Sequence, residues 1–279
     1  TRCSRDWSSD VCSSDLNEGI EFQLDGEILK LNDLTWTAGF NIAYNRTELL
    51  NLGDVKEMTY SGDSRIKHTV GKSMYTFYIK DYYGVNPSNG DALWRTKDGT
   101  LTNDFNKAAY IYAGSPEPKF IGGFNTMVTW KGFSLSTFLE FKQGNEVLIV
   151  ENRYINADGN QMSMNQSKHA LNYWQKPGDT GVSPKPIAGQ STNSYNTAST
   201  RWMEDGSYTR IKDLTLSYML PQKYASSLKL GSLKVYVSAL NLYTFHNVNF
   251  WDPERGVTGM GAGIYPMTKT FIGGIELSF

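Results

Sequence analysis

The clearest pattern in the chain is a strict alternation of apolar and polar positions over residues 34–45. Apolar side chains occupy the even positions, and Thr, Gly, Asn and Ala occupy the odd ones. Successive side chains of an extended strand point to opposite faces, so this period predicts a strand with one apolar face. The same period recurs in segments 123–130, 133–142, 213–220, 232–239 and 271–279, and more weakly in 17–25, 70–83 and 90–97.

The predicted strands are joined by connections of very unequal length. Lys131-Gly132 is a minimal turn between two alternating segments, which predicts a hairpin. Segment 145–205 is rich in Asn, Ser, Thr, Gly and Pro, and a structureless loop that long is unusual in a compact soluble domain. If the predicted strands cross an outer membrane and residue 279 lies on the periplasmic side, alternating strand directions place every long connection on the extracellular side. These connections are 47–68, 98–118, 145–205 and 246–265.

Taken together, these features favour an all-β fold, an antiparallel transmembrane β-barrel. The alternation by itself favours a soluble β-sandwich with one solvated face. Long strands, one-sided loops and aromatic residues near the predicted strand ends reverse that preference, because such barrels have short turns on one side and aromatic girdles. The mean hydropathy of −0.44 favours neither fold, since only alternate residues of each barrel strand face lipid and the average stays low. The girdle candidates are Trp36, Trp130, Tyr218, Tyr243 and Phe279.

The last predicted strand, 271–279, ends on an aromatic side chain. Its pattern resembles the C-terminal assembly signal of bacterial outer-membrane proteins, a glycine followed by hydrophobic residues at the third-last and last positions. Gly274, Leu277 and Phe279 occupy those positions, whereas Ile272 stands where the signal usually has a polar residue. The resemblance implies that this strand closes a barrel.

Residues 1–16 differ from the rest of the chain. The string from Arg5 to Leu16 resembles a translated sequencing adapter, so we expect 1–16 to be non-native and 17–279 to be the structural unit. On that reading the chain is the later part of a longer gene product. Both cysteines, Cys3 and Cys12, lie in the adapter-like segment, which leaves 17–279 without a thiol for a disulfide or a metal site.

The charge balance changes little when this segment is removed. Taking Arg2 and Arg5 from the 27 basic residues, and Asp6, Asp10 and Asp15 from the 28 acidic ones, leaves 25 of each. A neutral chain gives no reason to expect a nucleic-acid partner.

A search for chemistry returns no catalytic constellation. His68, His169 and His246 are far apart and lack metal-ligand spacing, so we predict no metal site, no cofactor, no catalytic residues and no enzyme activity. Acidic residues are plentiful enough for a glycosidase-type carboxylate pair, but no pair stands out. Flat aromatic rings in the loops suit sugars, peptides or a cap protein, although packing between loops explains them equally well. The candidates are Tyr154, Trp174, Trp202 and Trp251.

Ordered phrases across residues 17–279 resemble the SusC/RagA class of TonB-linked outer-membrane transporters. They include Gly114-Ser115-Pro116-Glu117-Pro118, the run from Arg201 to Tyr218, and Asp252-Pro253-Glu254. The resemblance implies a large barrel that encloses an N-terminal plug, of which this chain supplies about nine C-terminal strands. The plug and the segment that contacts TonB are not among these residues.

The resemblance also implies partners and a function. The expected partners are a SusD-like surface lipoprotein, the TonB complex acting through the N-terminal part, outer-membrane lipid, and an oligosaccharide or peptide substrate. The expected function is TonB-dependent nutrient uptake, the import of glycans or peptides across the cell outer membrane. The alternative is a soluble or surface-exposed β-sheet protein that binds carbohydrate without transport.

Overall fold

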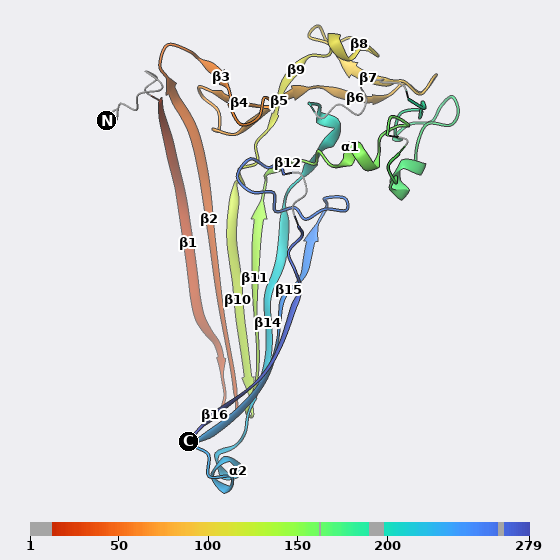
Figure 1. Cartoon of the computed structure of the whole chain (residues 1–279). Helices are drawn as coiled ribbons and strands as arrows, with labels where there is room; N and C mark the ends of the chain where they lie inside the picture. The colour runs from red at the N-terminus through yellow and green to blue at the C-terminus, as the bar shows by residue number, and fades with distance from the viewer. Residues whose placement is uncertain (1–12, 162, 190–197, 262–264) are drawn as a thin grey trace.

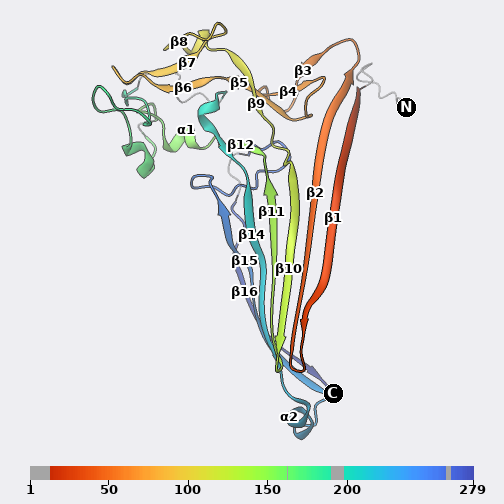
Figure 2. The ribbon, with the colours of Figure 1, turned by 180° about the vertical axis from the view of Figure 1, so that it is seen from behind.

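The computed structural model describes residues 13–161, 163–189, 198–261 and 265–279. Seven long strands form one antiparallel sheet in which neighbours in sequence order are neighbours in space, β1-β2-β10-β11-β14-β15-β16 (Figure 1). The sheet is strongly curved, and the same order is visible from behind in Figure 2. Its strands are β1 (Ser13–Lys30), β2 (Leu34–Leu52), β10 (Phe120–Trp130), β11 (Phe133–Gln143), β14 (Tyr208–Met219), β15 (Ser232–His246) and β16 (Thr270–Ser278).

All the long connections lie at one end of this sheet, and the short turns and the C-terminus lie at the other (Figure 1). The long connections contain three small antiparallel sheets. They are formed by β3 (Glu57–Thr59), β4 (Ile66–Thr69), β5 (Thr76–Lys80) and β9 (Tyr110–Gly114); by β6 (Tyr82–Val85), β7 (Ala92–Arg95) and β8 (Leu101–Thr102); and by β12 (Glu146–Leu148) and β13 (Met203–Asp205).

Helices are few and short in the described residues. They are α1 (Asn152–Ile155), α2 (Gln222–Ser227), η1 (Phe105–Lys107), η2 (Lys168–Leu171) and η3 (Thr200–Trp202). No helix in the described part of the chain has the length and apolar character needed to cross a membrane.

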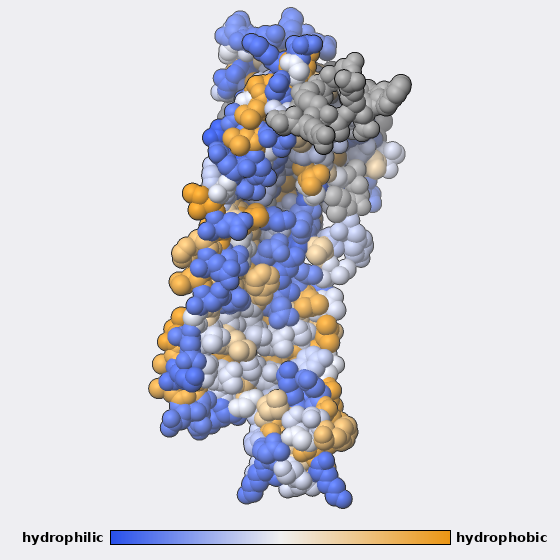
Figure 3. Space-filling model, turned by 90° about the vertical axis from the view of Figure 1, so that its left-hand side faces the viewer, coloured by the Kyte–Doolittle hydropathy of each residue, from blue (hydrophilic) through white to orange (hydrophobic). Residues whose placement is uncertain are grey.

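Cross-strand pairing sorts the side chains of the main sheet into two chemically distinct faces. One row of paired residues runs through Val128, Leu135, Leu216 and Val237, and all of them lie on the outer, apolar face. This face is exposed in the chain: Val237 retains 58% of its accessible surface and Ile275 retains 70%. Figure 3, which views the molecule from the left of Figure 1, shows hydrophilic side chains along the middle and hydrophobic ones along the edges.

The buried hydrophobic core lies among the long connections and not on the main sheet. Its largest cluster contains Ile66, Phe77, Ile79, Leu148 and Trp202, each at most 4% exposed. Burial of such side chains contributes about 1.5–3 kcal/mol each, so the connections form a packed layer of their own. A soluble sandwich would have placed its core against the long strands.

The Lys131-Gly132 hairpin shows how the sequence determines a local structure. Both residues have positive φ, 47° for Lys131 and 88° for Gly132. Positive φ at both central positions is the type I′ turn, whose twist matches the right-handed twist of the flanking strands. Trp130 and Phe133 therefore pair directly, and the predicted hairpin is confirmed.

The number of long strands differs from the expected nine. Segments 70–83 and 90–97 form only short strands of the small sheets, so the main sheet has seven strands. A strand that crosses a bilayer needs about 9–11 residues, and β5 and β7 are too short. Their apolar side chains are instead buried among the connections, where Phe77 and Trp94 are fully covered.

The N-terminal boundary of the sheet lies inside the adapter-like segment. β1 begins at Ser13, so its pairing with β2 includes adapter-like residues up to Leu16, which lies opposite Glu48. Backbone pairing depends little on side-chain identity, so this pairing leaves the predicted boundary at residue 17 untested. Both cysteines belong to residues 1–12, outside the described residues.

Candidate functional site

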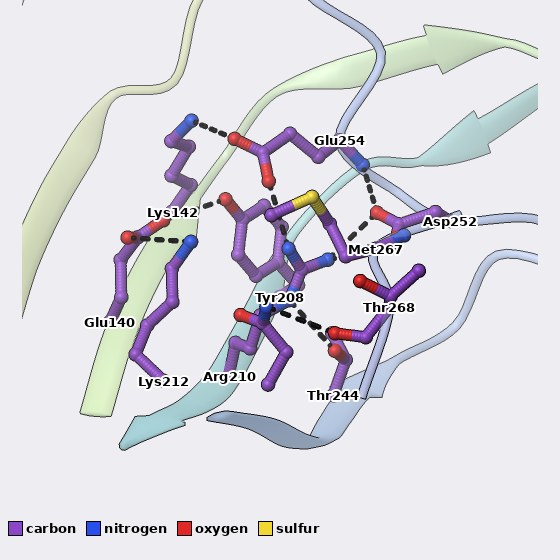
Figure 4. Close-up of polar contacts among 11 residues, drawn as sticks. Glu140, Lys142, Tyr208, Arg210, Lys212, Thr244, Asp252, Glu254, Met267 and Thr268 are labelled. Carbon is purple, nitrogen blue, oxygen red and sulfur yellow. Dashed lines mark hydrogen bonds and ion pairs between the residues drawn. The ribbon is translucent and has the colours of Figure 1, made fainter. Parts of the chain in front are cut away.

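A buried arginine anchors the last long connection to the inner face of the sheet. Arg210 lies on β14, and its side chain is fully buried. Its inner-face neighbours are Glu140 on β11 and Thr244 on β15. The connection between β15 and β16 turns back toward the sheet and places Asp252 and Glu254 against the guanidinium group (Figure 4).

All three nitrogens of the Arg210 guanidinium group donate hydrogen bonds. Nη2 donates to both carboxylate oxygens of Asp252, at 2.7 and 2.9 Å, and Nη1 donates to Glu254 Oε2 at 2.9 Å. Nε donates to Thr244 Oγ1 at 2.8 Å. The planar guanidinium group thus reaches Asp252, Glu254 and Thr244 through three different nitrogens, which the single ammonium nitrogen of a lysine cannot reproduce.

A second layer of charges supports this contact. The guanidinium carbon of Arg210 lies 5.0 Å from the ring centroid of Tyr208, whose hydroxyl donates to Glu140 Oε1 at 2.9 Å. Lys212 and Lys142 form ion pairs with Glu140 and Glu254, each at 3.3 Å (Figure 4). Each carboxylate near Arg210 therefore faces a cation.

The next residue, Arg255, binds in the opposite direction, toward the packed connections. Its Nη1 donates to Glu151 Oε1 at 2.6 Å and to the carbonyl oxygen of Gly261 at 2.7 Å, and the side chain of Arg255 is almost fully buried. Residues Asp252–Arg255 thus connect the sheet to the connection layer, and we call this segment the bracket.

Glu204 joins the same layer to the residues just before the bracket. It accepts from Asn152 Nδ2 at 2.9 Å and from the backbone N–H of Asn249 at 2.6 Å, while Trp251 Nε1 donates to Asn152 Oδ1 at 2.9 Å. Burial raises the pKa of the Glu204 carboxyl, although these hydrogen bonds oppose the shift. The Glu204 carboxylate therefore takes up a proton at a higher pH than an ordinary glutamate does.

A cavity of about 350 Å³ adjoins the bracket, between the upper inner face of the sheet and the connections. Tyr75, Pro116, Tyr208 and Val257 supply much of its apolar wall, and Lys142, Glu254 and Arg255 supply charge. Lys142 and Glu254 pair with each other and Arg255 pairs with Glu151, so the arrangement suits the holding of a loop or a neutral solute. In the described part of the chain, no group of three or more His, Cys, Asp and Glu side chains could hold a metal ion.

The structure separates the four predicted aromatic contact residues. Trp202 and Trp174 are 4% and 8% exposed, and the Trp174 indole donates to the carbonyl of Pro87 at 3.0 Å. Trp251 is half-buried in the Glu204 network. These three rings pack connections together, which is the alternative the sequence left open. Tyr154 is half-buried beside Arg153 and lines a separate cavity.

The residues of the predicted assembly signal lie on β16. Leu277 and Phe279 are exposed, 47% and 93%, and Leu277 belongs to the outer, apolar face. Gly274 occupies an inner-face position and pairs with Tyr236. The Cζ atom of the Tyr236 ring would lie 2.4 Å from a Cβ added at Gly274. A glycine here lets the Tyr236 ring cover the strand, an aromatic–glycine pairing known to stabilise sheets.

The girdle candidates fall into two groups along the strands. Trp130 and Phe133 flank the short turn, and Phe133 lies 4.5 Å from the Tyr218 ring. At the other end, Tyr243 packs against Phe245 at 4.7 Å. Trp36 lies one pair in from the turn, and its indole donates to Thr126 Oγ1 at 2.8 Å.

Sequence reasoning did not single out Arg210 or assign a role to the bracket. The phrase Asp252-Pro253-Glu254 was visible, but its partner lies 42 residues earlier in a strand. The signal that could have identified it is an arginine at an inward position of an alternating strand, where an uncompensated charge is costly.

Comparisons with known proteins agree with this geometry. No family model matches the chain. TonB-dependent receptor P3 of Formosa agariphila is 26% identical over 94% of this chain and 28% of its own length. TonB-dependent receptor SusC of Bacteroides thetaiotaomicron is 24% identical over 94% of this chain and 26% of its own length. The solved structure of the RagAB peptide transporter superposes with a TM-score of 0.84 at 28% identity, over 97% of this chain and 30% of that chain.

The chain is a homologue of the SusC/RagA-type TonB-dependent receptors.

This homology indicates the cellular location of the chain and the larger structure to which its sheet belongs. By this homology the chain is an outer-membrane protein, and its seven long strands are part of an antiparallel transmembrane β-barrel. The relatives are receptors and transporters, not enzymes. The chain spans less than a third of the length of the relatives it matches.

Proposed function

We propose that these seven strands form the later, C-terminal part of the barrel wall of a TonB-dependent importer of glycans or peptides. The observation that carries the proposal is the exposed apolar outer face, which continues across all seven strands while the protein core lies elsewhere. Hydrocarbon is the environment that such a face fits, because no second layer of the chain covers it in the described residues.

The spacing of the aromatic residues supports a membrane-spanning height. On β10, Phe120 and Trp130 lie at opposite ends of the strand. The ten residue steps between them correspond to about 33 Å at ~3.3 Å per residue. A tilt of about 35–45° reduces this to roughly 23–27 Å, close to the ~25 Å apolar band of outer-membrane barrels.

The inner face and the mouth support a path for solutes. Asn41, Asn125, Ser136 and Thr215 are polar residues of the inner face, which suits water, a plug domain or a passing substrate. At the outer end, the bracket holds the connections together, and Tyr154 remains available to a ligand or a SusD-like cap lipoprotein. Energy from a TonB complex would enter through other parts of the receptor.

Uptake by cells that produce the complete receptor tests the function. Cells with the receptor should accumulate a labelled oligosaccharide or peptide pool, and deletion of the receptor or of TonB should abolish that uptake. Purification from outer membranes should recover a surface lipoprotein with the receptor. Recovery of the receptor from the soluble fraction would contradict the proposal.

A pair of arginine substitutions tests the assignment of the two faces. Val237→Arg places a charge on the outer face near mid-strand and should cost about 2–4 kcal/mol of folding free energy in lipid. Ser136→Arg on the inner face is the matched control and should cost much less. Urea titration of each receptor in vesicles measures the difference, and equal costs would argue against a lipid-facing Val237.

A further inference from the structure

The connection between β14 and β15 differs from the other short turns because it carries a helix that projects beyond the sheet (Figure 1). We infer that this segment, which we call the foot, inserts into the headgroup region of the inner, phospholipid leaflet and binds anionic phospholipid. The foot comprises Tyr224 and Leu228 with Lys223 and Lys229. The inference rests on the proposed function only in placing this end of the barrel on the periplasmic side.

The foot has an apolar side with no partner in the described residues. Tyr224 and Leu228 are 59% and 60% exposed. Tyr224 lies in α2 and Leu228 is its C-cap residue, about one turn later on the same side, so the two side chains form one patch. A tyrosine and an aliphatic side chain together are typical of residues at membrane interfaces.

The opposite side of the helix holds the foot in place. Ala225 is fully buried, and its carbonyl accepts from the backbone N–H of Leu230 at 3.0 Å. The N–H of Gly231 donates to the carbonyl of Ser278 at 2.6 Å, which ties the connection to the last strand. The exposed patch is therefore presented by a fixed backbone.

The charge of the foot is one-sided. Residues 220–233 contain Lys223 and Lys229 and no Asp or Glu. Each lysine near an anionic membrane surface contributes to binding, and its long aliphatic stem can lie along apolar surface while the ammonium group reaches the headgroups. This complementarity favours an anionic phospholipid over a neutral one.

The foot also continues the lipid-facing surface of the barrel. β14 ends at Met219, directly after Tyr218, which packs against Phe133 in the aromatic group near the short turn. This group marks the edge of the apolar band, and the next chemical layer beyond it is the headgroup region. In Figure 3, hydrophilic side chains project below the lower end of the molecule while hydrophobic ones lie just above them.

Collision accessibility of spin labels tests the foot in the complete receptor. Cys3 and Cys12, where present, are replaced by serine, and single labels are placed by Tyr224→Cys, Leu228→Cys and Ser226→Cys. The receptor is reconstituted into vesicles of phosphatidylethanolamine and phosphatidylglycerol. Accessibility to oxygen, which enriches in lipid, is compared with accessibility to a water-soluble nickel chelate. Leu135→Cys on the outer face serves as the control for a label in lipid.

We expect labels at 224 and 228 to favour oxygen, as the label at 135 does, whereas the label at 226 favours nickel. Replacing both lysines with glutamate should shift the label at 228 several-fold toward nickel, and so should vesicles of phosphatidylcholine alone.

Two results would overturn the inference. Nickel accessibility at 224 and 228 equal to that at 226 would show a foot in water, and protection from both reagents would show that a protein covers it. A lipid signature at 135 in either case leaves the barrel assignment intact, whereas its loss would instead contradict the proposed function.

Discussion

Replacement of Arg210 by methionine should release the bracket from the barrel wall. Methionine keeps much of the side-chain volume but removes the four hydrogen bonds to Asp252, Glu254 and Thr244. Loss of one partner of a buried ion pair costs about 3–5 kcal/mol, because the remaining charges stay behind unpaired. The Glu254 side chain is 32% exposed, so solvent screens its share and the lower end of that range applies.

A cost of about 3 kcal/mol corresponds to roughly a 100-fold increase in the opening of the bracket. Arg210→Lys keeps the charge but replaces three donor nitrogens with one, so it cannot bond Asp252, Glu254 and Thr244 together; we expect about half the free-energy cost and roughly a tenfold increase in opening. The matched control is Arg46→Met, because the Arg46 side chain is 54% exposed and pairs with Glu18 and Glu48 at the surface. Its cost should stay below about 1 kcal/mol.

Hydrogen exchange in the complete, reconstituted receptor is the assay. Two backbone amides report directly on the bracket: Glu254 N–H donates to Asp252 Oδ1 at 2.9 Å, and Met267 N–H donates to Asp252 Oδ2 at 3.3 Å. Both should exchange faster in Arg210→Met, while amides of β14 keep their protection. Unchanged exchange at both amides in Arg210→Met, or an equal change in Arg46→Met, would refute the reasoning.

Three further outcomes are expected. Gly274→Ala should lower the free energy of unfolding by about 1–3 kcal/mol, because its Cβ meets the Tyr236 ring; urea titration should show little effect for Gly273→Ala, where nothing lies within 4 Å. The connection layer should lose stability as pH rises above the ordinary glutamate pKa through the raised pKa of Glu204, because the unfolded form loses its proton first; proteolysis across a pH series should show a flatter profile for Glu204→Gln, and stability that rises with pH in this window would contradict the assignment. The 279-residue chain alone should not insert stably into vesicles, since β1 and β16 each leave one unpaired edge in the described sheet; recovery of a protease-resistant, vesicle-bound product would show otherwise.

The main sheet was predictable because apolar and polar residues alternate with a period of two in every long strand. The faces, the Lys131-Gly132 hairpin and the location of the long connections at one end all follow from it. The same reasoning wrongly assigned segment 70–83 to the main sheet. A short segment has the same alternating pattern whether its apolar side chains contact lipid or a local protein core. Phe77 and Ile79 meet a local core.

The bracket was not predictable, because its geometry depends on a connection that folds back over the sheet. Arg210 and Glu254 are 44 residues apart, and no local pattern relates them. The loop tryptophans pose a related problem, since an aromatic ring in a polar segment indicates packing and ligand contact equally. Trp202 is buried and Tyr154 is not, and this difference follows from tertiary packing that composition does not encode.

The length of β2 determines how far the connection layer stands above the apolar band of the main sheet. The strand continues from Tyr44, near the upper edge of the apolar band, to Leu52, which is buried in the connection layer. These residues add about 26 Å along the strand at ~3.3 Å each, or roughly 20 Å of height at the tilt of a barrel. In the barrel proposed above, that height would place the connection layer beyond the polar headgroup region, which adds only about 5–8 Å on each side of the hydrocarbon core.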